Sequence, residues 1–264
     1  MIYKATDVVN FAQGEIVMLG AYVGLMLYYY LKLPYLLAFL ATLVGLGIFG
    51  ILMERIAYRP LIKQPVFSII IATLGMSIVL QNGAQIIWGP DLYPFPSTHI
   101  SIPIQIRSLL INPQGISVLT ISVFFMLLLF LFFKFTKFGK AMKATAQNKT
   151  AAAMMGISVN RVFSITWAIS SALGAVSGIL LAPLVGVSPQ MGWIGMKSFI
   201  AAIIGGFTSL PGAVVGGLVL GIIENLVGYY ISTAYKDVCA YAVLMLVLIV
   251  KPTGFFEKEM RKKV

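Results

Sequence analysis

The feature that most constrains this chain is a series of continuous apolar runs separated by short polar breaks. Crossing the apolar core of a bilayer takes about 20 such residues in an α-helix. Only helices and closed barrels satisfy the backbone inside lipid, and barrel strands would show short alternating segments instead. Charged residues make up 10% of the 264 positions, against roughly a quarter in soluble proteins. We therefore expect an all-α, polytopic transmembrane bundle that forms a single domain over residues 1–264.

The apolar runs predict about eight spans, of which the second and the sixth are short enough to tilt or to be re-entrant. The runs are 8–31, 34–52, 66–88, 116–133, 161–182, 193–208, 211–230 and 236–250. A cytoplasmic C-terminal tail then places fifteen basic residues inside and three outside, with Lys197 left within a span. This asymmetry follows the positive-inside rule. It explains the net charge of +11 without nucleic acid and predicts two cytoplasmic termini.

The loop 89–115 is predicted to lie outside. Alternation of apolar and polar residues from His99 to Arg107 favours a small β-ribbon, which Pro103 would limit to an edge. The ribbon is either a docking ridge for an external partner or a lid packed on the bundle. His99 is the only histidine and is expected at the surface, and the only cysteine, Cys239, is expected to pack in a span. Neither a metal site nor an intrachain disulfide is therefore predicted.

One segment is too polar for lipid. Residues 134–161 hold six basic residues and no acid, yet they are rich in alanine and methionine. This composition predicts a short amphipathic element at the cytoplasmic surface, where Asn148 or Thr150 can cap a helix and a left-handed Gly156 can end it. One face of that helix would hold Ala151, Met154 and Met155. Methionine adapts well to a partner's groove; the alternative is a solvated helix between spans.

Ionisable residues inside the apolar runs are candidates for the transport pathway or for an intramembrane polar network. Such groups are costly in a membrane and usually face a cavity or a partner. Glu15 has Gln13 close by, Glu224 is followed by Asn225, and Lys197 is a possible partner for either carboxylate. Alternatively, Glu15 reaches the cytoplasmic interface. The same three charged groups would also suit proton-coupled or ion-coupled transport.

Small residues recur four positions apart in three runs. Close approach of helix backbones is what packs helices in lipid, so these ladders are expected at helix interfaces; they could also line a pathway. The predicted packing residues are Gly174, Gly178, Gly217 and Gly221.

Several motifs together resemble one family, the LivH-like permease subunit of branched-chain amino acid ABC importers. They are Asn10-Phe11-Ala12-Gln13-Gly14-Glu15, Glu54-Arg55-Ile56-Ala57-Tyr58-Arg59-Pro60-Leu61, the span from Ala72 to Asn82, the turn Gly205–Ala213 and Tyr235-Lys236-Asp237. The resemblance covers nearly the whole chain. LivH-like permeases usually begin with a further span before the first motif, whereas Met1 lies nine residues before Asn10 here. The resemblance thus implies either a chain that is truncated or mis-started before the first motif, or a short form of the family.

The resemblance implies a permease subunit that forms the pathway for branched-chain or related amino acids in an ATP-driven importer of the inner membrane. An external binding protein would deliver the substrate, and a second, distinct permease and two ATPase subunits would complete the assembly. The residues that resemble the loop seated in the ATPase are Thr150, Ala151, Ala152, Met154, Met155, Gly156 and Ile157.

The chain contains no G-x-x-x-x-G-K-[ST] phosphate loop. We therefore expect a non-enzymatic subunit with no catalytic residues and no cofactor, in which ATP and Mg²⁺ are bound by partner subunits. Two other functions fit the composition. One is an ion-coupled secondary transporter of small polar solutes, and the other is a membrane scaffold without transport.

Overall fold

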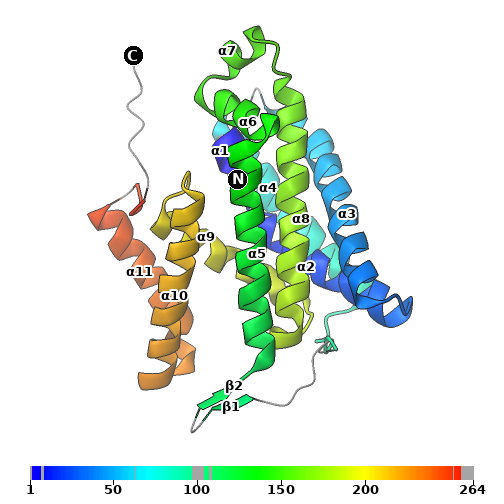
Figure 1. Ribbon diagram of the computed structural model, residues 1–264, viewed down its shortest axis with the longest axis vertical. Helices are drawn as coiled ribbons and strands as arrows, with labels where there is room; N and C mark the ends of the chain where they lie inside the picture. Colours follow the sequence, from blue (N-terminus) through cyan, green and yellow to red (C-terminus); the bar gives the residue numbers. More distant parts are fainter. Residues whose placement is uncertain are drawn as a thin grey trace. The chain divides into compact units, whose positions relative to one another are not determined.

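The computed structural model describes residues 2–6, 9–62, 64–96, 104–106, 109–251 and 253–256. Contacts divide the chain into two compact units. The larger unit holds Ile2 and Lys4–Gly192, and the smaller unit holds Tyr3 and the residues from Trp193 onward. Helices dominate both units, as the apolar runs predict (Figure 1).

Six helices of the described chain are long and apolar enough to cross a membrane, so the expected eight spans are too many. Two runs account for the difference, 8–31 and 193–208. The six helical stretches are Tyr35–Leu61, Val66–Trp88, Pro113–Phe135, Val159–Val185, Pro211–Tyr230 and Thr233–Val250.

The run 8–31 is interrupted. Helix α1 (Ile2–Thr6) ends before it, and α2 (Gln13–Leu25) begins only at Gln13 and continues as the π-helical turn η1 (Met26–Tyr30). The side chain of Asn10 accepts a hydrogen bond from the Ala12 N–H at 3.1 Å. A side chain that binds the backbone two residues on favours a turn over a helix, which explains why α2 starts late.

The run 193–208 forms a helix that is too short to cross the hydrocarbon core. Helix α9 (Trp193–Gly205) has 13 residues, about 20 Å at 1.5 Å per residue, against a hydrocarbon core of about 30 Å. It ends at Gly206, whose φ is +99°. The Ser209 side chain then accepts the Gly212 N–H at 3.1 Å and starts α10 (Leu210–Tyr230).

The larger unit is built around α8 (Val159–Val185), which packs against α2 and against α3 (Tyr35–Met53). A Cβ atom added to Gly178 would collide with the backbone of Val17, and one added to Gly174 would press on Ile16. The predicted packing role of both glycines is therefore confirmed. On the other face of α8, Ser171 lies directly against Gly50 of α3.

Helices α4 (Val66–Trp88) and α5 (Pro113–Phe135) complete the long helices of this unit. Before α5, strands β1 (Ile104–Ile106) and β2 (Leu109–Ile111) pair antiparallel, with Ile104 opposite Ile111. A β-ribbon was expected in this stretch, although His99, Pro103 and Arg107 lie outside the described residues. In Figure 1 the strand pair lies at one end of α5, and the helices that follow α5 lie at the other.

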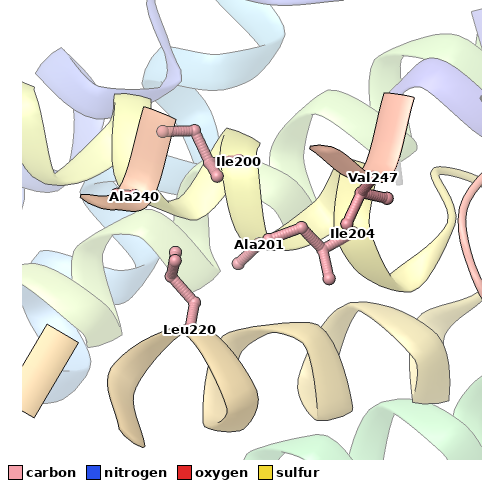
Figure 2. Packing of buried hydrophobic residues seen from close by; sticks show 6 residues of the cluster. All are labelled: Ile200, Ala201, Ile204, Leu220, Ala240 and Val247. Carbon is pink, nitrogen blue, oxygen red and sulfur yellow. The ribbon is translucent and has the colours of Figure 1, made fainter. Parts of the chain in front are cut away.

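In the smaller unit, α9 packs against α10 and α11 (Lys236–Val250). Figure 2 shows the apolar cluster that joins them: Ile200, Ala201, Ile204, Leu220, Ala240 and Val247. The close contacts of α10 with α9 are made by Gly212 and Gly216. A Cβ on Gly217 would meet only the Ala201 Cβ at 3.8 Å, and one on Gly221 would meet nothing within 4 Å. Within this chain the ladder that faces α9 is therefore shifted by one residue from the predicted one, and the packing role of Gly217 and Gly221 stays a prediction.

Candidate functional site

Two short helices follow α5 at one end of the larger unit, α6 (Lys137–Gln147) and α7 (Lys149–Met154) (Figure 1). Each begins with a side-chain cap. Thr136 Oγ1 accepts the Gly139 N–H at 3.1 Å, and Asn148 Oδ1 accepts the Ala151 N–H at 2.9 Å. Of the two predicted caps of α7, Asn148 fills the role, whereas Thr150 lies within the helix and is exposed.

Helix α7 ends in a Schellman motif, in which two N–H groups beyond the helix bond back to its last turn. The Gly156 N–H bonds to the Ala153 carbonyl at 3.0 Å, and the Ile157 N–H bonds to the Ala152 carbonyl at 3.0 Å. Gly156 has a φ of +80°, a left-handed conformation that glycine adopts without steric strain. The predicted helix end at Gly156 is therefore confirmed.

The outer face of α7 presents bulky apolar side chains. Met154 is 81% exposed and Met155 is 82% exposed, and Ala151 beside them is exposed as well. Ala152 is buried against the rest of the unit. Two flexible thioethers at the tip of a capped helix form a surface that a partner's groove can bury.

Basic residues of the larger unit lie at the same end as α7. The Lys149 ammonium donates to the Thr6 carbonyl at 3.2 Å and lies 5.9 Å from the ring centroid of Phe163. The Arg59 guanidinium reaches Ser164, close to the beginning of α8. The basic end of α3 and the segment 134–161 therefore share one end of the unit, as the positive-inside pattern predicts.

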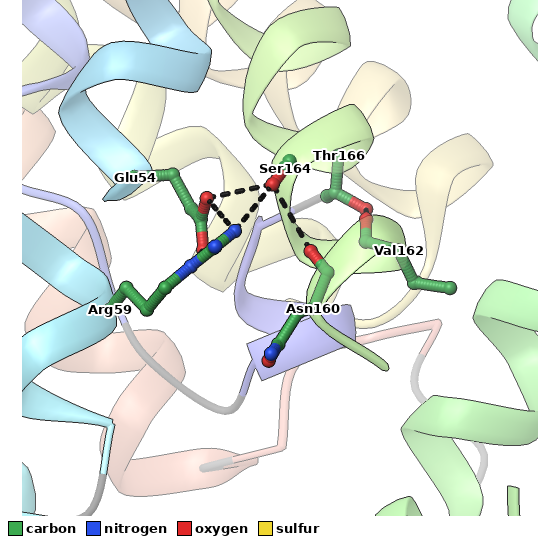
Figure 3. Close-up of polar contacts among 6 residues, drawn as sticks. All are labelled: Glu54, Arg59, Asn160, Val162, Ser164 and Thr166. Carbon is green, nitrogen blue, oxygen red and sulfur yellow. Dashed lines mark hydrogen bonds and ion pairs between the residues drawn. The ribbon is translucent and has the colours of Figure 1, made fainter. Parts of the chain in front are cut away.

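A complete charge cluster joins α3 to α8 at this end (Figure 3). Arg59 binds the Glu54 carboxylate with two N–H groups, Nε to Oε1 at 3.1 Å and Nη2 to Oε2 at 2.9 Å. The Ser164 hydroxyl donates to Glu54 Oε2 at 2.8 Å and accepts from Arg59 Nη2 at 2.9 Å. Glu54 is only 1% exposed, so this bidentate geometry compensates its burial.

Local backbone geometry brings Glu54 and Arg59 together. Residues Glu54–Tyr58 form the π-helical turn η2, followed by the 3₁₀ turn η3 (Arg59–Leu61), and the Arg59 N–H bonds to the Glu54 carbonyl five residues back. In an α-helix, residues three or four apart share a face, whereas the wider π turn aligns residues five apart. Sequence reasoning assigned no role to this pair, although the E-R-x-x-Y-R motif contained both residues.

The first motif of the chain places two polar side chains inside the larger unit. Gln13 exchanges hydrogen bonds with Ser170 of α8, from Nε2 to the Ser170 carbonyl at 3.1 Å and from the Ser170 hydroxyl to Oε1 at 3.2 Å. Glu15 is 6% exposed and accepts from the Ser77 hydroxyl of α4 at 3.1 Å. Glu15 is thus buried instead of reaching an interface, and its contacts with Ser77 were not predicted.

Three charged residues of the smaller unit form a second group. The Lys197 ammonium lies 3.3 Å from Glu224 Oε1 and 2.7 Å from Asp237 Oδ1. The predicted pairing of Lys197 with Glu224 is confirmed, and Asp237 is an additional partner that the sequence reasoning missed. Asn225 does not join this group, because its amide donates to the Gly221 carbonyl at 2.8 Å.

Comparisons with known proteins agree over the whole length. Residues 1–248 match a family model described as a branched-chain amino acid transport system permease component. The chain is 36% identical to the high-affinity branched-chain amino acid transport permease LivH of Escherichia coli K12, over 100% of this chain and 90% of that protein. It is 33% identical to BraD of Pseudomonas aeruginosa, over 100% and 91%, and 32% identical to a probable LivH of Methanocaldococcus jannaschii, over 99% and 87%. No solved structure matches the chain significantly.

Proposed function

Since this chain belongs to the family of branched-chain amino acid transport permeases, we propose that it forms the membrane pathway of an ATP-driven importer for these amino acids. It is a multi-pass protein of the inner membrane and a transport subunit. The similar proteins LivH and BraD are permeases of high-affinity branched-chain amino acid systems.

The proposed assembly contains this chain, a second and distinct permease, two ATPase subunits that bind ATP and Mg²⁺, and an external binding protein that delivers the substrate. Membership of the family supports the presence of ATPase and binding-protein partners. The stoichiometry and the identity of the second permease belong to the proposal.

The observation that carries the proposal is the tip of α7. A helix of six residues is too short to be stable alone, yet α7 is capped at both ends and exposes two methionines at the basic end of the larger unit. We assign this tip the task of docking into a groove of an ATPase subunit. Movement of the docked helix would reach α8 directly, because α8 follows α7 after four residues.

The test is co-purification of the permease with the ATPase subunits and the second permease, followed by uptake of leucine into proteoliposomes with binding protein and ATP. Met154→Asp should reduce ATPase association by about tenfold or more, since it places a charge in an apolar contact. Gly156→Pro should do the same, because proline cannot adopt a positive φ. Gln147→Asp is the matched control, an exposed change at the end of α6 that should leave association unchanged.

Two results would overturn the proposal. If Met154→Asp and Gly156→Pro both associate with the ATPase subunits as the wild type does, the α7 tip is not the docking site. Uptake by the permease alone under an ion gradient, without ATP, would favour the alternative of an ion-coupled transporter of small polar solutes that uses Glu15, Glu224 and Lys197.

A further inference from the structure

Helix α2 begins at mid-depth of the larger unit. Its first residue, Gln13, is bonded to Ser170, which lies about 17 Å along α8 from Val159 at 1.5 Å per residue. Further along, Gly174 lies against Ile16 and Gly178 against Val17. The two helices therefore run in the same direction, away from the basic end, and the break before α2 lies near the middle of α8.

A second stretch without α-helix reaches the same level. After α8 ends at Val185, the chain returns along α4 to the 3₁₀ turn η4 (Pro189–Gly192). The Gln81 amide donates to the Pro189 carbonyl at 3.3 Å, and Gly192 lies against the Glu15 carboxylate. A side chain on Gly192 would collide with both carboxylate oxygens. In many secondary transporters, interrupted helices near the middle of the membrane form the site of the transported solute.

Glu15 lies where these two interruptions meet, and its hydrogen bonding is incomplete. One oxygen accepts from Ser77, but Oε2 has no hydrogen-bond partner among the described residues. The carboxylate does not cap its own helix, since the Ala12 N–H is taken by Asn10. No lysine or arginine of the described residues pairs with it. A carboxylate that is 94% buried in this way requires either a proton or a cationic ligand.

We propose that Glu15 binds the ammonium group of the amino acid as it passes through the permease. The next residues on the same face of α2, Met18 and Tyr22, are fully buried. A cationic head beside an apolar chain is the chemistry of a branched-chain amino acid. Glu15 supplies the charge that matches this head, whereas Met18 and Tyr22 are packed inside the unit, with the Tyr22 ring stacked on Trp88 at 4.7 Å between centroids. Ser77 is the positioning residue that orients the carboxylate. This inference rests on the proposed function and names the group of the substrate that the pathway recognises.

The experiment compares two ligands of the same shape on the assembled importer in nanodiscs. Radiolabelled leucine carries the ammonium group, and 2-hydroxy-4-methylpentanoate replaces it with a hydroxyl. Glu15→Gln keeps an acceptor for Ser77 but loses the charge, so leucine binding should weaken about tenfold or more, as for hydrogen bonds between charged groups. Binding of the hydroxy acid should change by less than about threefold, because it carries no positive charge. Ser77→Ala should weaken leucine binding by a smaller factor.

Asp91→Asn is the matched control, since it neutralises an exposed carboxylate that follows α4 and lies outside the six long helices; leucine binding should stay at the wild-type level. If Glu15→Gln does not assemble, Glu15→Asp replaces it, with weaker leucine binding expected from the shorter side chain. Equal leucine binding by Glu15→Gln and wild type would overturn the inference, as would an importer that takes up leucine but shows no binding to the permease. A wild-type assembly without ATP-dependent leucine uptake would instead overturn the proposed function, and the role of Glu15 with it.

Discussion

The two compact units of this chain use charged residues in different ways. In the larger unit, Glu54 is almost fully buried, and Arg59 and Ser164 occupy both of its oxygens. In the smaller unit, Lys197 lies between Glu224 and Asp237, but Asp237 is 68% exposed. Removing one partner of a buried pair leaves an uncompensated charge, whereas an exposed pair contributes little. The same residue types are therefore fully enclosed in one unit and only partly enclosed in the other, where Lys197 is 39% and Glu224 17% exposed.

Glycine ladders show a parallel contrast. Gly178 of α8 lies against the backbone of α2, so the small-residue face of the larger unit packs against another helix of the same chain. Gly221 of α10 faces open space. A spacing of four shows that a helix has a smooth face, but only the register with its neighbour decides what that face contacts.

The largest expected effect is that of Arg59→Ala. It leaves the Glu54 carboxylate buried without a counter-charge and should lower the free energy of unfolding by about 3 kcal/mol, the lower end of the range for buried pairs because Arg59 is partly exposed. Lys197→Ala should lower it by less than about 1 kcal/mol. Thermal unfolding in detergent, followed by tryptophan fluorescence, measures both variants. Arg55→Ala, an exposed neighbour on the same turn, serves as control; equal losses for Arg55 and Arg59 would break the contrast.

An intermediate effect is expected for Gly178→Ala. The added methyl group would overlap the Val17 carbonyl and push α2 from α8, which typically lowers the free energy of unfolding by about 1–3 kcal/mol. Gly221→Ala meets nothing within 4 Å, so it should be neutral or stabilise α10 by up to about 1 kcal/mol through helix propensity. Thermal unfolding in detergent, followed by tryptophan fluorescence, measures the stability of both variants. Comparable destabilisation by both variants would show that Gly221 also packs against something in the folded protein.

The smallest effect on stability is expected for Glu15→Gln. Although Glu15 is nearly as deeply buried as Glu54, the amide keeps the hydrogen bond from Ser77 and removes no ion pair. The free energy of unfolding should change by less than about 1 kcal/mol. Glu15 and Glu54 are both buried, but only Glu54 has partners on both oxygens. Comparing the two variants therefore tests whether burial or pairing of a carboxylate determines its effect on stability. A loss as large as that of Arg59→Ala would indicate that Glu15 is itself part of the structural framework.

Much of the architecture follows from composition and spacing. The six long helices coincide with predicted runs, and Asn148 and Gly156 delimit α7 as their side chains suggest. The mean hydropathy of the run 8–31 predicts one span because it hides the polar residues at the beginning of the run. Asn10, Gln13 and Glu15 were the available signal, since three polar residues within six positions oppose a continuous span.

The serine contacts of the buried carboxylates could not be predicted from the sequence, for a physical reason. Ser77 and Ser164 are separated by 62 and 110 residues from the carboxylates that they contact. Nothing in a serine within an apolar helix tells which distant side chain it faces. Lys197 was easier, because a lone intramembrane lysine needs an acid and Glu224 was one of two available.

The π-helical turn at Glu54–Tyr58 has a consequence for how this chain tolerates insertions and deletions. Such a turn is equivalent to one extra residue accommodated within a regular helix. Deleting a residue there would restore the α-helical register and rotate Arg59 by about 100° relative to Glu54. The Glu54–Arg59 pair therefore depends on the length of this segment as much as on its side chains, and a length change of one residue is the more damaging mutation.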